Sequence, residues 1–319
     1  MDIQQKDTNT RGHFLLSAGI LTAGILFAPR EIFAQTSPLN TIIAIAAAAK
    51  DPIIVKALRG NIHVLEGSGG NIAVFSGSDG KLMVDCGIDV SHQKISGAVA
   101  GISSSPLKYL VNTHWHFDHA GGNEWFQQEG ATIVAHENTR KHLSVSTTIK
   151  DFNYTFPPAP QNALPTMIFK DEHAMNFNGS EIKIKYYSPA HTDSDISVYF
   201  SKADILHVGD TWGNGSYPFI DHSSGGTLDG MVKAANHNIE ITTDKTIIIP
   251  GHGPVGNRRQ LKEYRDMLIA VRENVSKLKK SGKSLKETIA AKPTAAYDEK
   301  WGKTIIDGAT FTMLVYADV

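Results

Sequence analysis

Directly after the apolar run 107–112, seven consecutive residues read Thr113-His114-Trp115-His116-Phe117-Asp118-His119. Three imidazoles and one carboxylate gathered this closely are hard to explain by packing, because imidazoles that protonate together repel one another. A bound metal removes that cost, since neutral imidazole is a good zinc ligand. The spacing of His114 and His116 lets one loop direct both rings at one ion, while Asp118 and His119 can address a second. The stretch therefore predicts a metal site at the end of a buried strand.

Three later segments repeat the context of a strand end followed by a turn. Each places one ligand-type side chain just after an apolar run, and these side chains are His191, Asp210 and His252. Structural zinc sites usually close with four ligands and favour cysteine. The single cysteine, Cys86, lies in a strand-like run and is expected to be a buried, inert thiol. Five histidines and two aspartates suit an open, two-metal catalytic site better.

These four motifs, in this order, resemble those of the metallo-β-lactamase superfamily, and within it the glyoxalase II-like hydrolases. The resemblance covers about 61–252, and the motifs together are highly specific. It implies an α/β (α+β) fold, namely a four-layer αββα sandwich with the metals at one edge of the two sheets.

The resemblance also implies a role for each ligand. The implied set is two triplets and a bridging residue: His114, His116 and His191 for a first zinc ion, Asp118, His119 and His252 for a second, and Asp210 between them. Two zinc ions would share a water, lower its pKa towards 7 and let the resulting hydroxide attack a carbonyl carbon. Asp118 would be the catalytic residue that orients the hydroxide and relays a proton to the leaving group.

Patterns along the chain predict the elements around this site. Runs rich in Ile, Val and Phe bounded by Gly and Asp predict strands at 61–66, 71–76, 81–85, 107–112, 132–135, 181–187, 196–200, 205–208 and 246–250. Helices are expected at 42–50, 92–102, 123–129, 137–143, 228–237 and 259–280. Residues 144–165 contain prolines among aromatic residues and predict a long irregular loop. The pattern alone indicates an α/β or α+β fold.

The first 34 residues have the order of a secretory signal. Lys6 and Arg11 precede the apolar run 14–28, and Ala34 offers a cleavage point. The run is too short and too rich in Ala and Gly for a membrane span. We therefore expect a periplasmic or secreted protein with no stable membrane span after signal removal. Its residues 35–319 would form a single domain with a C-terminal helical extension. An uncleaved amphipathic helix is the alternative, and the export route is left open.

Charge and composition bear on the partners of this protein. Lys and Arg number 31 against 32 Asp and Glu, a formal net charge of −1, so electrostatic capture of nucleic acid has no compositional support. We expect a small-molecule substrate. The long helix 259–280 and the tail to Val319 either cover the pocket or form a homodimer interface, and the sequence leaves both open.

Several reactions fit this ligand set. Hydrolysis of an ester, thioester or lactone is the main prediction, because an aspartate at the bridging position is typical of such relatives. Glyoxalase II itself is disfavoured, since its basic substrate-binding residues find no match in the C-terminal part. β-Lactam hydrolysis is the alternative, favoured by the export signal but not by the absence of a cysteine or serine ligand near Asp210. A mononuclear iron persulfide dioxygenase is a third hypothesis.

Substrate choice is expected to lie in loops. The candidates are 66–71, 144–165 and 212–224. Aromatic residues that could form pocket walls, or pack in the core instead, are Trp115, Trp212, Tyr217 and Phe219. His222 is left open as either a pocket or a surface residue.

Overall fold

The structure of the protein, a computed structural model, describes residues 49–319. The chain separates into two units, Met1–Gln35 and Thr36–Val319, and every described residue belongs to the second. The predicted signal segment 1–34 and all but the last two residues of the predicted helix 42–50 therefore lie outside the described residues. Those two residues, 49–50, are in a turn.

Within residues 49–319, the strands form two large sheets and one hairpin. The seven-stranded sheet has the order β1 (Ile54–Ala57), β2 (Ile62–Glu66), β3 (Ile72–Gly77), β4 (Gly80–Val84), β5 (Leu107–Val111), β6 (Thr132–His136) and β9 (Met167–Phe169). The six-stranded sheet has the order β10 (Glu172–Phe177), β11 (Ser180–Tyr186), β12 (Ile196–Phe200), β13 (Ile205–His207), β14 (Ile247–Ile249) and β15 (Gly256–Asn257). The hairpin pairs β7 (Thr147–Ile149) with β8 (Tyr154–Phe156).

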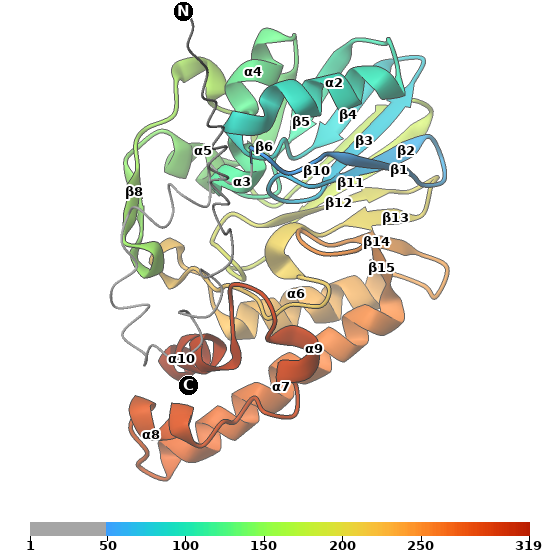
Figure 1. Cartoon of the computed structure of the whole chain (residues 1–319). Coiled ribbons are helices and arrows are strands. Elements are labelled where there is room, and N and C mark those ends of the chain that lie inside the picture. The colour runs from blue at the N-terminus through green and yellow to red at the C-terminus, as the bar shows by residue number, and fades with distance from the viewer. Residues whose placement is uncertain (1–48) are drawn as a thin grey trace, which may run out of the picture. The chain divides into compact units, whose positions relative to one another are not determined.

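Helices cover the outer face of each sheet (Figure 1). Those on the side of the seven-stranded sheet are α2 (His92–Ile102), α3 (Phe117–Ala120), α4 (Asn123–Gln128) and α5 (Glu137–Leu143). Those on the side of the six-stranded sheet are α6 (Leu228–Ile241), α7 (Arg258–Lys280), α8 (Leu285–Ala290), α9 (Asp298–Trp301) and α10 (Gly308–Asp318). The result is the predicted four-layer αββα sandwich.

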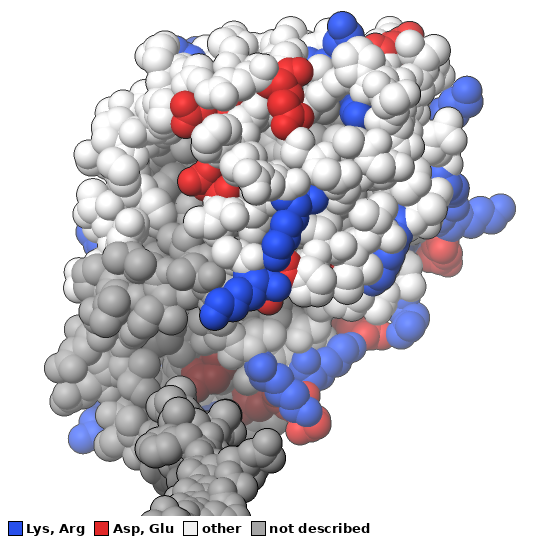
Figure 2. Space-filling view, turned by 45° about the horizontal axis from the view of Figure 1, so that its top comes forward, with Lys and Arg blue, Asp and Glu red and all other residues white. Residues whose placement is uncertain are grey.

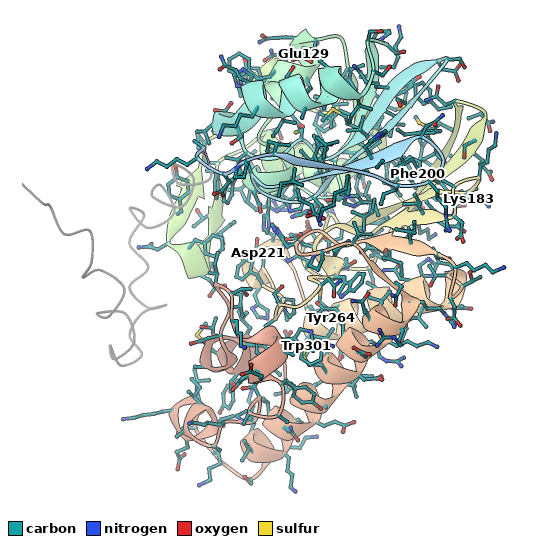
Figure 3. All side chains as sticks on the ribbon, turned by 45° about the vertical axis from the view of Figure 1, so that its right-hand side comes forward. Glu129, Lys183, Phe200, Asp221, Tyr264 and Trp301 are labelled. Atoms are coloured by element: carbon teal, nitrogen blue, oxygen red, sulfur yellow. The ribbon has the colours of Figure 1, made fainter. Side chains whose placement is uncertain are left out.

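The period-2 pattern of the strands explains why two separate cores form. Along β3, Ala73 and Phe75 face the space between the sheets, whereas Ile72 and Val74 pack under the helices with Ile95 of α2. Between the sheets, Phe75 meets Phe200 edge-on at 5.5 Å between ring centroids. Figure 3 shows Phe200 in this layer and Tyr264 of α7 against the other face of the second sheet. Burial on both faces of each sheet holds the strand ends, and therefore the loops that follow them, in place.

The structure corrects the sequence interpretation in several places. The predicted irregular loop 144–165 contains the β7–β8 hairpin. Strands β1, β9, β10 and β15 were missed because they are the edge strands of the two large sheets and consist mostly of exposed or half-buried residues, which gives a weak apolar signal. The C-terminal extension holds the helices α8, α9 and α10 beyond the predicted helix 259–280. The other predicted strands and helices in the described region are present.

The single cysteine, Cys86, lies in the core, so the prediction that it is buried is confirmed. Burial raises the pKa of its thiol well above the usual value, which fits the expected inertness. On the face shown in Figure 2, acidic and basic side chains are scattered among uncharged ones. None of the helices in residues 49–319 combines the length and the apolarity that a membrane crossing requires.

Candidate metal centre

The seven predicted ligands converge at one edge of the two sheets. Strands β13 and β14 are parallel neighbours, so Asp210 and His252, which follow them, emerge from the same edge. Strand β11 is separated from β13 by one antiparallel strand, so it runs in the same direction and delivers His191 to that edge too. The loop after β5 brings the remaining four ligands from the other sheet.

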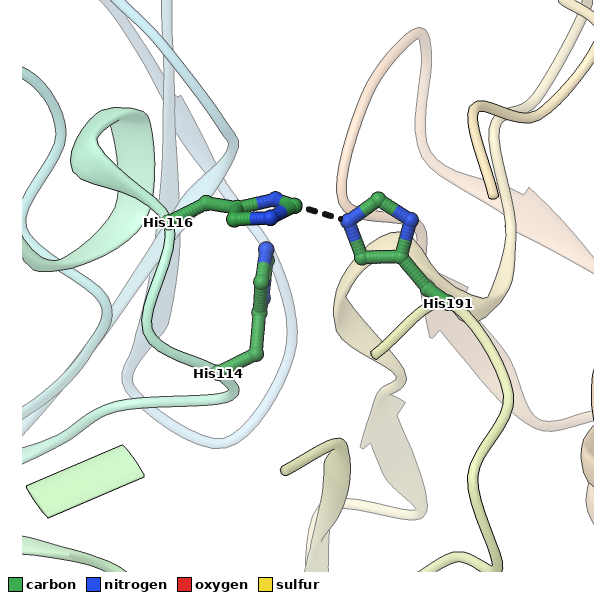
Figure 4. Close-up of side chains that lie close together, drawn as sticks. All are labelled: His114, His116 and His191. Carbon is green, nitrogen blue, oxygen red and sulfur yellow. Dashed lines mark hydrogen bonds between the residues drawn. The ribbon is translucent and has the colours of Figure 1, made fainter. Parts of the chain in front are cut away.

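Three imidazoles form the first group of ligand atoms. One ring nitrogen each from His114, His116 and His191 lies within 4.8 Å of the other two. Nδ1 of His116 is 2.9 Å from Nε2 of His191, and the His114 ring stands across both (Figure 4). All three rings are buried. Nε2 of His114 has no hydrogen-bond partner among the described residues, as expected of a nitrogen that is meant to meet an ion.

The second group consists of Asp118, His119 and His252, whose ligand atoms also lie within 4.8 Å of one another. Nε2 of His252 is 3.2 Å from Oδ2 of Asp118. Asp210 lies between the two groups, with Oδ2 3.5 Å from His191 Nε2 and 3.4 Å from His252 Nε2. Its Oδ1 is also 3.1 Å from Nε2 of His119, and His114, His119 and Asp210 form a third group of ligand atoms within 4.8 Å of one another.

The pKa shifts show how the site balances its charges. Burial, together with neighbouring imidazoles, lowers the pKa of His114 well below its usual value and that of His191 to about 4, so both rings are neutral at pH 7. Burial by itself would lower the pKa of His252, but the carboxylates of Asp210 and Asp118 outweigh this effect and raise the pKa to about 10. Without a metal, the two carboxylates therefore need a protonated imidazole as counterion. A bound divalent metal ion could balance the charge of the two carboxylates in place of the protonated imidazole.

The donor set fits zinc. Imidazole nitrogen and carboxylate oxygen are the ligands found in catalytic zinc sites, which keep a position open for water or substrate. The first group offers three imidazoles and the second offers two imidazoles with a carboxylate. The unpartnered His114 Nε2 faces the centre of this set.

A layer of outer partners that the sequence did not identify orients the rings. Nδ1 of His119 is 2.8 Å from Oδ2 of Asp85, which also accepts a hydrogen bond from the Thr113 hydroxyl. Nε2 of His116 is 3.1 Å from Oδ2 of Asp221. Nδ1 of His191 is 2.8 Å from the backbone oxygen of Phe219. Such partners fix the tautomer of a ligating histidine, leaving the other nitrogen free for the metal.

Asp85 has a conformation that signals its role. It is fully buried and has φ +62°, a left-handed backbone that Asp tolerates better than most residues. Its Oδ1 accepts a hydrogen bond from the backbone N–H of Thr113 at 2.7 Å, which ties the end of β4 to the ligand loop. An aspartate at the end of a predicted strand, 81–85, was the available signal in the sequence. His222, which the sequence left open, does not line the cavity over the ligands. Its Nε2 lies 3.2 Å from Oδ1 of Asp318 in α10.

Gly70 gives a direct test of how tightly the ligand rings are held. A Cβ on Gly70 would lie 2.1 Å from Cε1 of His119, so Gly70→Ala must displace that ring. We expect the metal affinity to fall by at least about tenfold, as it does when a ligand loses its orientation. The measurement is a zinc titration of the metal-free variant.

Gly97→Ala is the matched control for that variant. Gly97 lies in α2, where an added Cβ meets nothing within 4 Å. This change should leave zinc affinity unaltered and raise the free energy of unfolding by about 0.5–1 kcal/mol. Wild-type zinc affinity in Gly70→Ala would show that the His119 ring is not constrained as described.

A cavity of about 350 Å³ opens over the ligand groups. Of the four aromatic residues for which pocket wall and core packing were both left open, Tyr217 and Phe219 line it. Trp212 is fully buried in the core, and Trp115 lines a neighbouring cavity instead. The loop between α9 and α10, at 304–306, forms part of the wall. The C-terminal extension therefore contributes to the pocket.

Comparison with known proteins identifies the family. A family model described as the metallo-beta-lactamase superfamily matches residues 65–272, more than half of the chain. The chain is 23% identical over 167 residues to a probable metallo-hydrolase, YqgX, of Bacillus subtilis, covering 50% of this chain and 75% of that protein. It is 26% identical over 127 residues to a hydroxyacylglutathione hydrolase of Pelagibacter ubique, covering 40% of this chain and 45% of that enzyme. It is 23% identical over 163 residues to the metallo-beta-lactamase IND-1 of Chryseobacterium indologenes, covering 51% and 62%. For the last two relatives, the match thus spans less than two thirds of their length.

Solved structures share the fold. The crystal structure of the DIM-1 metallo-beta-lactamase superposes with a TM-score of 0.55 at 19% identity, covering 68% of this chain and 97% of that one. A double mutant of the sec-alkyl sulfatase PisA1 superposes with a TM-score of 0.63 at 15% identity, covering 86% of this chain and 51% of that one. The matched family model, the sandwich architecture and the convergent histidines and aspartates lead to one conclusion: this chain belongs to the metallo-beta-lactamase superfamily.

Proposed function

We propose that the protein is an exported, binuclear zinc hydrolase that cleaves the carbonyl group of an ester, thioester or lactone. The observation that carries this proposal is the arrangement of two ligand triplets around Asp210 at the floor of one cavity. His114, His116 and His191 would hold one zinc ion and Asp118, His119 and His252 the other, with Asp210 shared. Bound zinc would polarise the substrate carbonyl and lower the pKa of a coordinated water towards 7.

The chain itself supplies proton transfer and orientation. Burial favours the neutral form of Asp118, but the nearby His119 and His252 outweigh it and hold the pKa of Asp118 at about 2, so the carboxylate stays ionised. Asp118 lines the cavity, where it can accept the proton of the attacking water and return it to the leaving oxygen or sulfur. Water thus adds across the acyl bond, giving a carboxylic acid and an alcohol or thiol.

The names of the similar proteins support a hydrolase over a non-catalytic protein. The similar proteins are named as a metallo-hydrolase, hydroxyacylglutathione hydrolases and a metallo-beta-lactamase. Cys86 does not belong to the ligand groups, since its sulfur lies 3.3 Å from Oδ1 of Asn123 under α4. A site of imidazoles and carboxylates alone favours ester, thioester or lactone cleavage over β-lactam cleavage, which stays the alternative.

Metal content and turnover, measured together on the mature chain, test the proposal. The panel is a thioester, a lactone, an aryl ester and a chromogenic cephalosporin, with metals counted by mass spectrometry. About two zinc ions per chain and fast ester or lactone cleavage are the expected result. Faster cephalosporin cleavage would select the alternative, and a single iron with oxygen-dependent persulfide consumption would overturn the hydrolase. Fractionation of cells expressing the full chain tests export.

A further inference from the structure

Apolar side chains from several separate segments line the cavity over the metal centre. Phe152 and Phe219 stack on one another, with ring centroids 4.8 Å apart, and both line the cavity. Phe152 comes from the segment before β8 and Phe219 from the loop after Asp210, so two separate loops build one aromatic wall. Asp221, labelled in Figure 3, lies two residues after Phe219 in that loop, and its Oδ2 is 3.1 Å from Nε2 of His116.

Another part of the wall comes from the C-terminal extension. Ile305 and Ile306 lie in the loop between α9 and α10 and line the cavity. The backbone N–H of Tyr217 donates to the oxygen of Trp301 at 2.8 Å, and the Tyr217 hydroxyl donates to Asp298 at 2.9 Å. These bonds tie the extension to the loop that carries Phe219. They also occupy the Tyr217 hydroxyl, the polar end of a residue that otherwise offers the cavity an aromatic surface.

Ile305 stands out on this wall because 80% of its surface is exposed. The apolar surface of such an isoleucine is in contact with water, which is unfavourable. A ligand bound in the cavity can cover this surface and remove it from water. Full burial of such a side chain is worth about 1.5–3 kcal/mol. The edge of the cavity thus offers apolar surface that substrate can bury.

No lysine or arginine of residues 49–319 lines the cavity. The charged side chains that line the cavity are predicted metal ligands, which lie at its floor. The polar side chains Asn214, Ser216 and Thr304 also line the cavity, but none of them carries a positive charge that could pair with a carboxylate on a part of the substrate remote from the reacting carbonyl. Burying a charge without a partner is strongly unfavourable. The walls consequently select against substrates that carry a remote anionic group.

Resting on the proposed hydrolase function, we propose that the substrate carries an uncharged, apolar acyl chain that lies between Phe219 and Ile305. Phe152, Phe219 and Ile305 are its specificity-determining residues. The chain binds through burial of apolar surface, and the reacting carbonyl reaches the ligand groups at the floor.

A chain-length series on the zinc-loaded protein tests this. The substrates are p-nitrophenyl acetate, butyrate and hexanoate, with the monoester of adipic acid as an anionic partner of hexanoate, each corrected for its rate with hydroxide alone. We expect kcat/KM to rise at least about tenfold from acetate to hexanoate, since each buried methylene contributes up to about fourfold. Hexanoate should exceed the anionic adipate ester by at least about tenfold. A flat series, or a preference for the adipate ester, would overturn the proposal.

Ile305→Lys is the most informative variant, because an exposed position accepts a lysine without disturbing the fold. It should lower the hexanoate-to-adipate ratio at least about fivefold by removing apolar surface and giving the carboxylate a partner. Ile168→Lys is the matched control, since Ile168 is 49% exposed on the strand β9 and does not line the cavity. Equal ratios in the two variants would show that Ile305 does not touch the acyl chain.

A binding measurement separates this proposal from the hydrolase assignment. Acetohydroxamate and hexanohydroxamate are titrated calorimetrically into the zinc-loaded protein. At least about tenfold tighter binding of the longer compound supports the apolar site even if no ester is cleaved, in which case only the hydrolase function fails. Equal affinities would overturn the apolar site whether or not esters are cleaved.

Discussion

Replacing His116 by alanine is expected to abolish turnover and to remove metal from the first ligand group. The change leaves His114 and His191 as the remaining imidazoles there, and it strips Asp221 of its ring partner. Because loss of an outer partner alone weakens metal binding about 10–100-fold, loss of a ligand should weaken it by more than about 100-fold. Turnover should fall by about a thousandfold or more, the equivalent of several kcal/mol of lost electrostatic stabilisation. Mass spectrometry of metal content and assays on the best substrate measure both.

The control for this variant is His237→Ala. His237 is half-buried on α6 and belongs to none of the ligand groups. It should keep full metal content and turnover. If His116→Ala matched His237→Ala in both measurements, the metal centre would not be where the two triplets indicate.

Asp118→Asn should have the second largest effect, and mainly on kcat. The amide is close in shape to the carboxylate, but it neither carries charge nor accepts a proton. Proton transfer by a positioned side chain typically contributes about 10²–10⁴-fold, so we expect kcat to fall within that range. The loss of the 3.2 Å contact with His252 should also weaken metal binding to the second group. Assays at saturating zinc separate the two effects.

Asp193→Asn is the matched control for Asp118→Asn. Asp193 also pairs with a histidine, with its Oδ1 2.7 Å from His142 Nε2, but it does not line the cavity. Its replacement should leave kcat within about twofold of wild type. An unchanged kcat in Asp118→Asn with zinc fully bound would rule out a catalytic role for Asp118.

Most elements of the fold could be predicted from local pattern, whereas their arrangement as a four-layer sandwich was implied by the resemblance to a known family. Strands such as 72–77 alternate apolar side chains between two buried faces, and that alternation is visible in the sequence. The edge strands β1, β9, β10 and β15 and the β7–β8 hairpin escaped prediction. Their residues are mostly half-buried or exposed, and their pairing depends on partners that the local sequence does not contain.

The residues that support the ligands could not be identified in the same way. Asp85 reaches His119 across 34 positions of the chain, and Asp221 reaches His116 across 105. A lone aspartate at a strand end or in a turn has no spacing that reveals its partner. Only the packing of the two sheets brings each carboxylate within hydrogen-bond distance of a ring nitrogen.

By itself, then, the sequence determined which side chains converge at the edge of the sheets, because each follows a buried strand whose end is defined by local hydrophobic pattern. The tertiary structure decided which aspartates orient those rings and which residues form the walls. Ile305 and Phe219 lie 86 positions apart, on segments that Tyr217 connects through its bonds to the C-terminal extension. A surface built from distant loops has no local pattern, since its chemistry exists only once the chain has folded.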